Sequence, residues 1–247
     1  MEAGARRPHI PGMIKLPALL AALAYGLVLW GFSVFRLKRQ LDRRSTPLNE
    51  PGLRDVVGRM AAALDLPRID VLVHEVEPVN GLAAPDGRIF LTRGFLRKFR
   101  AGEVTAPELA SVIAHELGHV ALGHTRRRLI DFTGQNAIRL VLSGVLGRLL
   151  PFGIGVAMAN GLASLVTARL SRQDEYEADA YAAALLTKAG IGTAPQKSLF
   201  QKLEGMTGMG GHGIPAWLMS HPEPEKRIAA IEVLEARWSG GGPLRPT

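Results

Sequence analysis

The sequence predicts a predominantly helical α+β domain, with a small β-sheet before its central helix and a transmembrane helix at the N-terminus. Three observations lead to this prediction. Several segments carry apolar residues at helical spacing, and short segments between residues 69 and 92 alternate like strands. Residues 16–35 form an uncharged run. The central helix carries an H-E-x-x-H motif at residues 115–119.

The chain has 247 residues, 47% of them apolar, which is enough for one sizeable core or for one core and a membrane anchor. It contains no cysteine, which excludes disulfides, zinc–thiolate sites and cysteine nucleophiles. The formal net charge of +8 is compatible with nucleic acid, with an anionic membrane surface or with no specific partner. The position of the charges therefore has to separate these possibilities.

The uncharged run 16–35 is long enough to cross a bilayer as a helix. A secretory signal peptide has a shorter apolar core and a cleavage site, whereas this run ends in basic residues that begin at Arg36. We predict a single-pass, uncleaved anchor over residues 13–36, after a tail at 1–12, in preference to a buried helix of a soluble core. More basic residues follow the span than precede it, which places the following domain in the cytoplasm.

Residues 37–51 are predicted to form a basic juxtamembrane linker. Because much of the positive charge gathers here, it is explained by attraction to lipid headgroups. No aromatic residues alternate with a basic stripe, as single-strand nucleic-acid binding prefers. We therefore expect membrane lipids, and not nucleic acid, as partners of the anchor and linker. The sequence leaves the oligomeric state open.

The globular domain is predicted to cover residues 52–238, and residues 239–247 to form a flexible tail. It opens with a helix at 53–64 and a strand at 69–73. A hairpin follows, because apolar segments at 79–83 and 88–92 flank the turn signal Pro-Asp-Gly at 85–87.

The next helix begins at a capping box, with Thr105 as N-cap and Glu108 at its third position. It carries H-E-x-x-H from His115 to His119 inside an apolar run. Residues four apart share one helix face, so the two imidazoles can bind a single metal ion, and Glu116 has the position of the general base in a zinc hydrolase. The alternative is a chance pair of core histidines.

This helix is predicted to continue to about Arg128, which would put His124 off the ligand face by roughly 140°. Metzincins need a glycine three residues after the second motif histidine and a third histidine six residues after it. Leu122 and Thr125 stand at those positions instead. The third ligand must come from another segment.

Glu175 and Asp179 are four residues apart on a later predicted helix that ends near Gly190. A carboxylate from a second helix is what a His-His-Glu zinc site requires, with the fourth position left for water. Asp179 would then orient a ligand histidine. Glu177 points to another side of the helix and offers a control, while a solvated acidic face is the competing interpretation.

A second uncharged run covers residues 149–168. A single crossing there would separate Glu175 from the two histidines, and Arg139 and Arg148 interrupt the length that two crossings need. We predict a glycine-rich hydrophobic helical region that packs on the domain or lies at the membrane surface.

A short helix is predicted at 196–204, then a mobile glycine-rich loop at 205–213 and a final amphipathic helix that reaches about Trp238. His221 stands at the start of the final helix, where backbone amides and an imidazole can face developing negative charge. Taken alone, such a histidine more often caps a helix or lies on the surface.

Four segments together resemble the membrane-associated gluzincin proteases related to HtpX and to the type 1 CAAX prenyl protease. They are VNGLAAPDGRIFLTRGFL, ELASVIAHELGHVALGH, SRQDEYEADAYA and SHPEPEKRI, in the family's order within residues 50–236. The resemblance implies a zincin core of the minigluzincin type and a zinc metallopeptidase domain over residues 52–238. The implied site residues are His115, His119 and Glu175 as zinc ligands, Glu116 as catalytic base, Asp179 behind a ligand, His221 as the group that stabilises the tetrahedral intermediate, Asn80, Gly81 and Leu82 on the edge strand that holds substrate, and Arg172 and Arg227 as supporting charges.

The resemblance also implies one zinc ion, polypeptide substrates that are unfolded or membrane-associated, a part in protein quality control, and the bacterial inner membrane as location. Family members often have alanine and an aromatic residue after the asparagine, whereas Gly81 and Leu82 follow Asn80 here. A zinc-stabilised membrane scaffold or chaperone with little proteolytic activity is the competing function.

Overall fold

The structure, a computed structural model, describes residues 28, 31–32, 35–36, 38–84, 86–124, 172–206 and 215–240. The chain divides into two units, residues 1–40 and 41–247. In the first unit, Val28, Phe32 and Phe35 are helical and exposed. No helix within the described ranges is long and apolar enough to cross a membrane.

Several predictions concern parts of the chain that the structure describes little or not at all. The predicted anchor at 13–36 falls almost wholly outside the described residues, and the apolar run at 149–168 falls entirely outside them. Most of the predicted glycine-rich loop and of the flexible tail also lies outside them. These four predictions remain predictions.

Helix α2 (Pro51–Ala63) begins with a proline in its first turn, where the missing backbone N–H costs nothing. Leu53, Val56, Met60 and Ala61 form its buried face. Strand β1 (Ser45–Pro47) precedes it and was not predicted, because the same residues read as part of a basic linker.

The small sheet contains β1, β2 (Val71–His74), β3 (Gly81–Ala83) and β4 (Ile89–Thr92) in the order β1-β2-β4-β3. The outer pairs, β1 with β2 and β3 with β4, are antiparallel, whereas β2 and β4 are parallel. The predicted hairpin is confirmed, with Leu82 opposite Phe90. β3 therefore lies at the edge of the sheet, and it packs against α4.

Helix α3 (Arg93–Arg100) follows β4 and was not predicted. The capping box predicted for α4 (Ala106–Ala121) is present, since Thr105 and Glu108 exchange both of its hydrogen bonds. The predicted end of this helix near Arg128 is wrong. α4 ends at Ala121 because the chain leaves the helix at Gly123, whose φ of 72° lies in the left-handed region.

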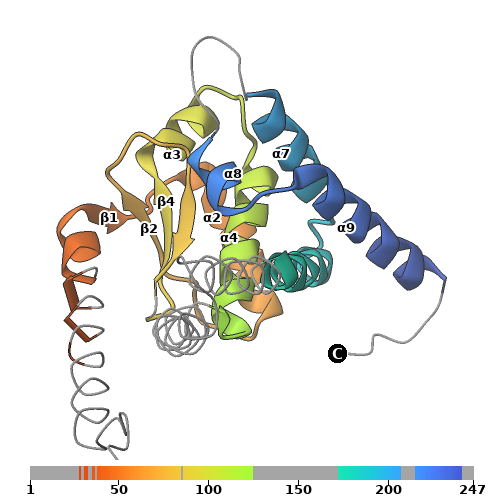
Figure 1. Cartoon of the computed structure of the whole chain (residues 1–247), viewed down its shortest axis with the longest axis horizontal. Coiled ribbons are helices and arrows are strands. Elements are labelled where there is room, and N and C mark those ends of the chain that lie inside the picture. The colour runs from red at the N-terminus through yellow and green to blue at the C-terminus, as the bar shows by residue number, and fades with distance from the viewer. Residues whose placement is uncertain are drawn as a thin grey trace, which may run out of the picture. The chain divides into compact units, whose positions relative to one another are not determined.

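The C-terminal part consists of a helix at residues 172–188, then α7 (Ala194–Gly205), α8 (Ala216–Ser220) and α9 (Pro224–Ser239). Figure 1 shows the strands on one side of α4 and the pair α7 and α9 on the other. The prediction that His221 opens the final helix is wrong, because α9 begins at Pro224. His221 instead follows the unpredicted helix α8, where its backbone N–H donates to the carbonyl of Trp217 at 2.8 Å.

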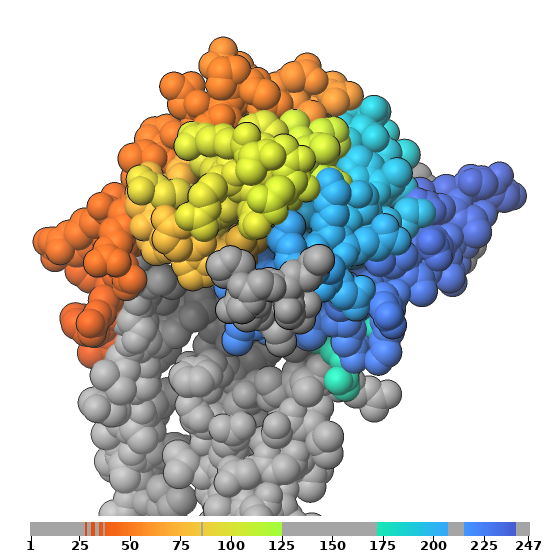
Figure 2. All heavy atoms as spheres, turned by 90° about the horizontal axis from the view of Figure 1, so that it is seen from above, coloured from red at the N-terminus to blue at the C-terminus, as the bar shows by residue number. Residues whose placement is uncertain are grey.

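One hydrophobic core surrounds α4, with contributions from α2, the sheet, helix 172–188 and α7. The polar contact between α4 and α7 is made by Glu108, which accepts hydrogen bonds from Ser198 Oγ at 2.6 Å and Lys202 Nζ at 2.9 Å. In Figure 2 the yellow-green residues of α3 and α4 lie beside the blue residues of α7. The result is a predominantly helical α+β fold, which confirms the predicted class.

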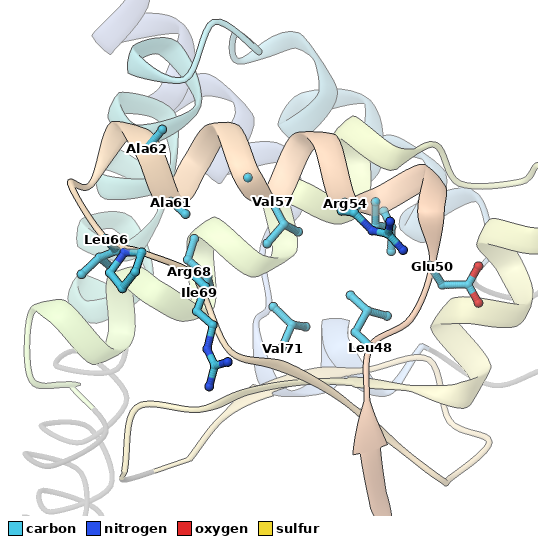
Figure 3. Close-up of a pocket in the computed structure, with 13 residues that line it drawn as sticks. Leu48, Glu50, Arg54, Val57, Ala61, Ala62, Leu66, Arg68, Ile69 and Val71 are labelled. Carbon is cyan, nitrogen blue, oxygen red and sulfur yellow. The ribbon is translucent and has the colours of Figure 1, made fainter.

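A pocket of about 350 Å³ lies between α2 and the chain on either side of it. Val57 of α2 points into it from one side, and Leu48 and Val71 from the other (Figure 3). None of its lining residues carries the H-E-x-x-H motif or a predicted ligand. The chemistry predicted from the sequence therefore lies elsewhere, on α4.

Candidate metal centre

Four buried side chains converge where α4 meets helix 172–188. His115 and His119 come from α4, Glu175 from helix 172–188, and His221 from the segment after α8. One ligating atom from each lies within 4.8 Å of the others. The two α4 histidines bring their Nε2 atoms to 3.1 Å, and the Glu175 oxygens lie 3.3 Å from the first and 3.5 Å from the second.

Gly118 allows the two helices to approach closely enough for this convergence. A Cβ atom at Gly118 would lie 2.9 Å from the carbonyl oxygen of Ala178 and 3.0 Å from its Cα. Real side chains do not tolerate such distances to backbone, which cannot rotate away. Only glycine at this position lets helix 172–188 bring Glu175 to the histidines.

We expect Gly118→Ala to lower the free energy of unfolding by about 1–3 kcal/mol, because overpacking forces the two helices apart. The matched control is Gly58→Ala on the exposed side of α2, where a Cβ would meet no atom within 4 Å. That change is expected to raise the free energy of unfolding by about 0.5–1 kcal/mol, from helix propensity alone. Urea denaturation of both variants provides the measurement, and equal stabilities would contradict the close-packing argument.

Asp179, one turn after Glu175, contacts the ring nitrogen of His115 that faces away from the cluster. Its Oδ1 lies 2.8 Å from Nδ1 of His115, which leaves Nε2 of that ring facing the other three converging side chains. Arg227 from α9 pairs with the same carboxylate, from Nε at 2.6 Å and from Nη2 at 2.7 Å. The guanidinium lies over the rings of Phe200 and Trp217, at 4.4 and 4.9 Å from their centroids.

The electrostatics of the cluster favour positive charge beside its two carboxylates. Burial lowers the pKa of His115, but the hydrogen-bonded Asp179 carboxylate outweighs burial and raises that pKa from 6.5 to about 9. Burial raises the pKa of Glu175, yet its bonds to His115 and His221 bring it far below its ordinary value. For Asp179, the charge of Arg227 overcomes burial and lowers the pKa. Both carboxylates are therefore anionic.

His221 and Glu116 lie at the same centre. His221 Nδ1 is 2.6 Å from a carboxylate oxygen of Glu175, and its Nε2 is 3.5 Å from Oε1 of Glu116. That Glu116 oxygen is buried and has no hydrogen-bond partner among the described residues. A buried carboxylate oxygen without a donor calls for a water molecule or a substrate group.

The edge strand β3 runs past this carboxylate. A Cβ at Gly81 would lie 2.6 Å from the side chain of Val112 and 3.8 Å from Oε1 of Glu116. Leu82 instead packs into a small second cluster around Phe90. The backbone N–H of Asn80 donates to Thr92 Oγ1 at 3.0 Å, while its buried Oδ1 has no partner within the described ranges.

The donor set fits a divalent transition metal. Two imidazole nitrogens and one carboxylate are the protein ligands of one type of catalytic zinc site. Here they are buried, close together and supported from behind by Asp179, which is the support that metal-bound histidines require.

Comparison with known proteins assigns the chain to a family. Residues 47–235 match the model of peptidase family M48. The chain belongs to this family. Metalloprotease LoiP of Escherichia coli K12 is 33% identical over 138 residues, which are 55% of this chain and 51% of LoiP. The match therefore spans about half the length of LoiP.

Two further relatives share lower identity with the M48 chain. A Protease HtpX homolog of Bordetella pertussis is 28% identical over 211 residues, covering 74% of this chain and 70% of that protein. Mitochondrial metalloendopeptidase OMA1 of Arabidopsis thaliana is 28% identical over 170 residues, which cover 67% of this chain and 32% of OMA1. The resemblance to HtpX-related metalloproteases is confirmed, and the chain is a metallopeptidase.

Two site predictions need correction in this M48 chain. Glu177 is not a neutral control, because its Oε2 lies 3.0 Å from Nε2 of His124. His124 is not among the four converging side chains, in line with its predicted place off the ligand face, but it lies 3.0 Å from His119 through their Nδ1 atoms, which the predicted offset of roughly 140° did not suggest. That offset assumed an unbroken helix, whereas α4 ends before His124.

The two predicted supporting arginines differ in their surroundings. Arg172 is exposed, whereas Arg227 is buried against Asp179. Sequence reasoning missed Trp217, whose ring lies 4.9 Å from that of His221, and Gln196, whose Nε2 lies 3.3 Å from Oδ1 of Asp179. The spacing of four residues between Trp217 and His221 was the available signal for the first. No local pattern pointed to the second.

Proposed function

We propose that this M48 chain is a zinc-dependent endopeptidase in which Glu116 is the general base. The observation that carries the proposal is the buried set of two imidazoles and one carboxylate beside a Glu116 oxygen that lacks a partner among the described residues. His115, His119 and Glu175 would hold one zinc ion. Oε1 of Glu116, which accepts no hydrogen bond from the described residues, is where an attacking water can donate its proton.

When bound, zinc supplies Lewis-acid polarisation of a water molecule and of the scissile carbonyl. Glu116 then accepts the proton of the water at Oε1 and delivers it to the leaving amine. His221 has its Nε2 within 3.5 Å of the same oxygen, a position from which an imidazole N–H can stabilise the negative charge on the former carbonyl oxygen. Asp179 and Arg227 keep His115 in one orientation throughout.

Substrate is proposed to add to the edge strand β3 as an extended chain. Support comes from the edge position of β3 and from Gly81, which lies against the helix that carries Glu116. Oδ1 of Asn80, which has no hydrogen-bond partner within the described part of the chain, offers an acceptor to a substrate N–H. Backbone pairing of this kind tolerates many sequences, which suits unfolded or membrane-associated polypeptides. A role in protein quality control is the further part of this proposal, and it follows from the resemblance of the four sequence segments to the gluzincin family.

We also propose that the chain is anchored in a membrane by residues 13–36, with the metallopeptidase domain in the cytoplasm. Support comes from the uncharged run 16–35 and the basic residues that follow it. Val28, Phe32 and Phe35 are exposed apolar side chains on helical backbone, as a lipid-facing surface requires. Lipid headgroups would contact the basic linker.

The test is metal-dependent cleavage by the full chain prepared in detergent. Removal of metal with a chelator is expected to abolish cleavage of an unfolded protein, because no other described group in the cluster replaces the Lewis acid. Adding zinc in excess of the chelator is expected to restore cleavage, measured by the appearance of new peptide termini. Cleavage that survives complete metal removal would contradict the proposal.

Fractionation of the cells, before detergent is added, tests the anchor. We expect the chain and its cleavage activity in the membrane fraction, resistant to extraction at high salt and alkaline pH. A chain without residues 1–36 is the matched control and is expected in the soluble fraction. Release of the full chain by salt alone would refute the anchor and leave the hydrolase proposal intact.

A further inference from the structure

A second group of polar side chains lies behind the proposed metal ligand His119. Nε2 of His119 faces the cluster, whereas its Nδ1 lies 3.0 Å from Nδ1 of His124. Nε2 of His124 lies 3.0 Å from Oε2 of Glu177 and 3.6 Å from Oδ1 of Asp174. The ring nitrogens of His124 therefore connect a metal ligand to a carboxylate pair.

The hydrogen-bond directions along this chain of groups are fixed once His119 binds metal. A neutral imidazole carries one proton, so a His119 that binds metal through Nε2 carries its proton on Nδ1. This N–H donates to Nδ1 of His124, which must be the acceptor. The proton of His124 is then on Nε2, where it faces Glu177. Each of the two imidazole N–H groups in this series then meets an acceptor, and no side chain has to move.

We propose that His124 is a positioning residue that orients the metal ligand His119, and that Glu177 in turn anchors His124. The proposal rests on the zinc site proposed above. The two ligand histidines then have different supports. His115 meets a carboxylate directly, at Asp179, whereas His119 reaches one through a second imidazole.

The local backbone is shaped for this contact. Gly123 has φ 72°, a conformation that side-chain-bearing residues rarely adopt, and it ends the helix between the two histidines. A continuous helix would carry His124 around to another face, as the angle of roughly 140° requires. His124 is instead fully buried, and a buried imidazole needs partners for both nitrogens.

Zinc affinity tests the proposal. His124→Leu removes the acceptor and substitutes an apolar side chain of similar length. We expect this change to weaken zinc binding by about 10- to 100-fold. His124→Asn retains an oxygen acceptor near the position of Nδ1 and is expected to recover part of that loss. Zinc dissociation constants are measured by chelator competition at one pH, and the visible spectrum of the cobalt-substituted protein reports the ligand geometry.

The matched control is His74→Leu, at a buried histidine of β2 whose Nδ1 lies 3.1 Å from Ser45 Oγ. This control is expected to lose stability without any change in zinc affinity or cobalt spectrum. Glu177→Ala provides a second arm that keeps the fold, because the Glu177 side chain is 39% exposed, and it is expected to weaken zinc binding less than His124→Leu does.

Three results would overturn the proposal. The first is a folded His124→Leu or Glu177→Ala protein with wild-type zinc affinity and cobalt spectrum. The second is a His124→Asn protein that recovers nothing, since the acceptor would then be irrelevant. The third is a wild-type protein that binds no zinc, which would also overturn the proposed function, whereas the first two results leave that function standing.

Discussion

Replacement of Glu116 by glutamine is expected to reduce kcat/KM for peptide cleavage by about 10²- to 10⁴-fold, the range that a general base contributes. The amide has nearly the same shape but cannot accept the proton of the attacking water. Zinc content is expected to stay at the wild-type level, since Glu116 is not among the proposed ligands. The measurement combines cleavage kinetics with metal analysis on the same samples.

The control for this experiment is Glu103→Gln, an exposed carboxylate that pairs with Lys98 and lies outside the cluster. It is expected to keep wild-type cleavage and wild-type zinc. A Glu116→Gln protein that binds zinc and cleaves normally would overturn the general-base role. If wild type and variant both hold zinc and neither cleaves, the scaffold or chaperone function is favoured instead.

The second large effect concerns the buried ion pair between Asp179 and Arg227. Asp179→Ala removes the carboxylate that is hydrogen-bonded to the buried guanidinium and leaves Glu175, at 3.8 Å, as its remaining counter-charge. We expect the change to lower the free energy of unfolding by about 3–5 kcal/mol. The same change frees the ring of His115, so zinc affinity is expected to fall by about 10- to 100-fold. Denaturation and zinc competition on one variant measure the two effects separately.

A double-mutant cycle separates the ion pair from the other contacts of each residue. Arg227→Met places an unbranched apolar side chain against Phe200 and Trp217 while removing the charge. The double variant removes both charges of the pair, so its destabilisation is expected to be smaller than the sum of the two single effects. The difference, which is the coupling energy, is expected to be about 0.5–3 kcal/mol. Additive effects would show that the pair does not act as a unit. The exposed pair Lys98–Glu103 provides the comparison, with an expected coupling of about 0–1 kcal/mol.

Features encoded by neighbouring residues were predictable. The capping box at Thr105, the face shared by His115 and His119, and the face shared by Glu175 and Asp179 each follow from a spacing of three or four residues. The hairpin followed from a turn signal between two apolar segments. For these features, the information needed is contained in one short segment.

Features that depend on distant partners or on one backbone angle were missed. β1 is too short to be recognised by itself, and it forms only because Ser45 to Pro47 pair with β2. The position of His124 depends on the φ of Gly123, which a periodicity argument takes to be helical. Glu177 was predicted to be a control because it points away from the ligand face, and its contact with His124 could not be foreseen without that backbone angle.

The contact between α9 and Asp179 has a consequence for the order in which the protein matures. During synthesis the motif from His115 to His119 leaves the ribosome first, and the Glu175 carboxylate follows. Arg227 emerges much later, and until then Asp179 has no guanidinium beside it. Domains fold as units during translation, so the nascent chain acquires the final geometry of the proposed metal site only after α9 has docked. A truncated or stalled product that ends before α9 would carry the complete motif without an organised centre.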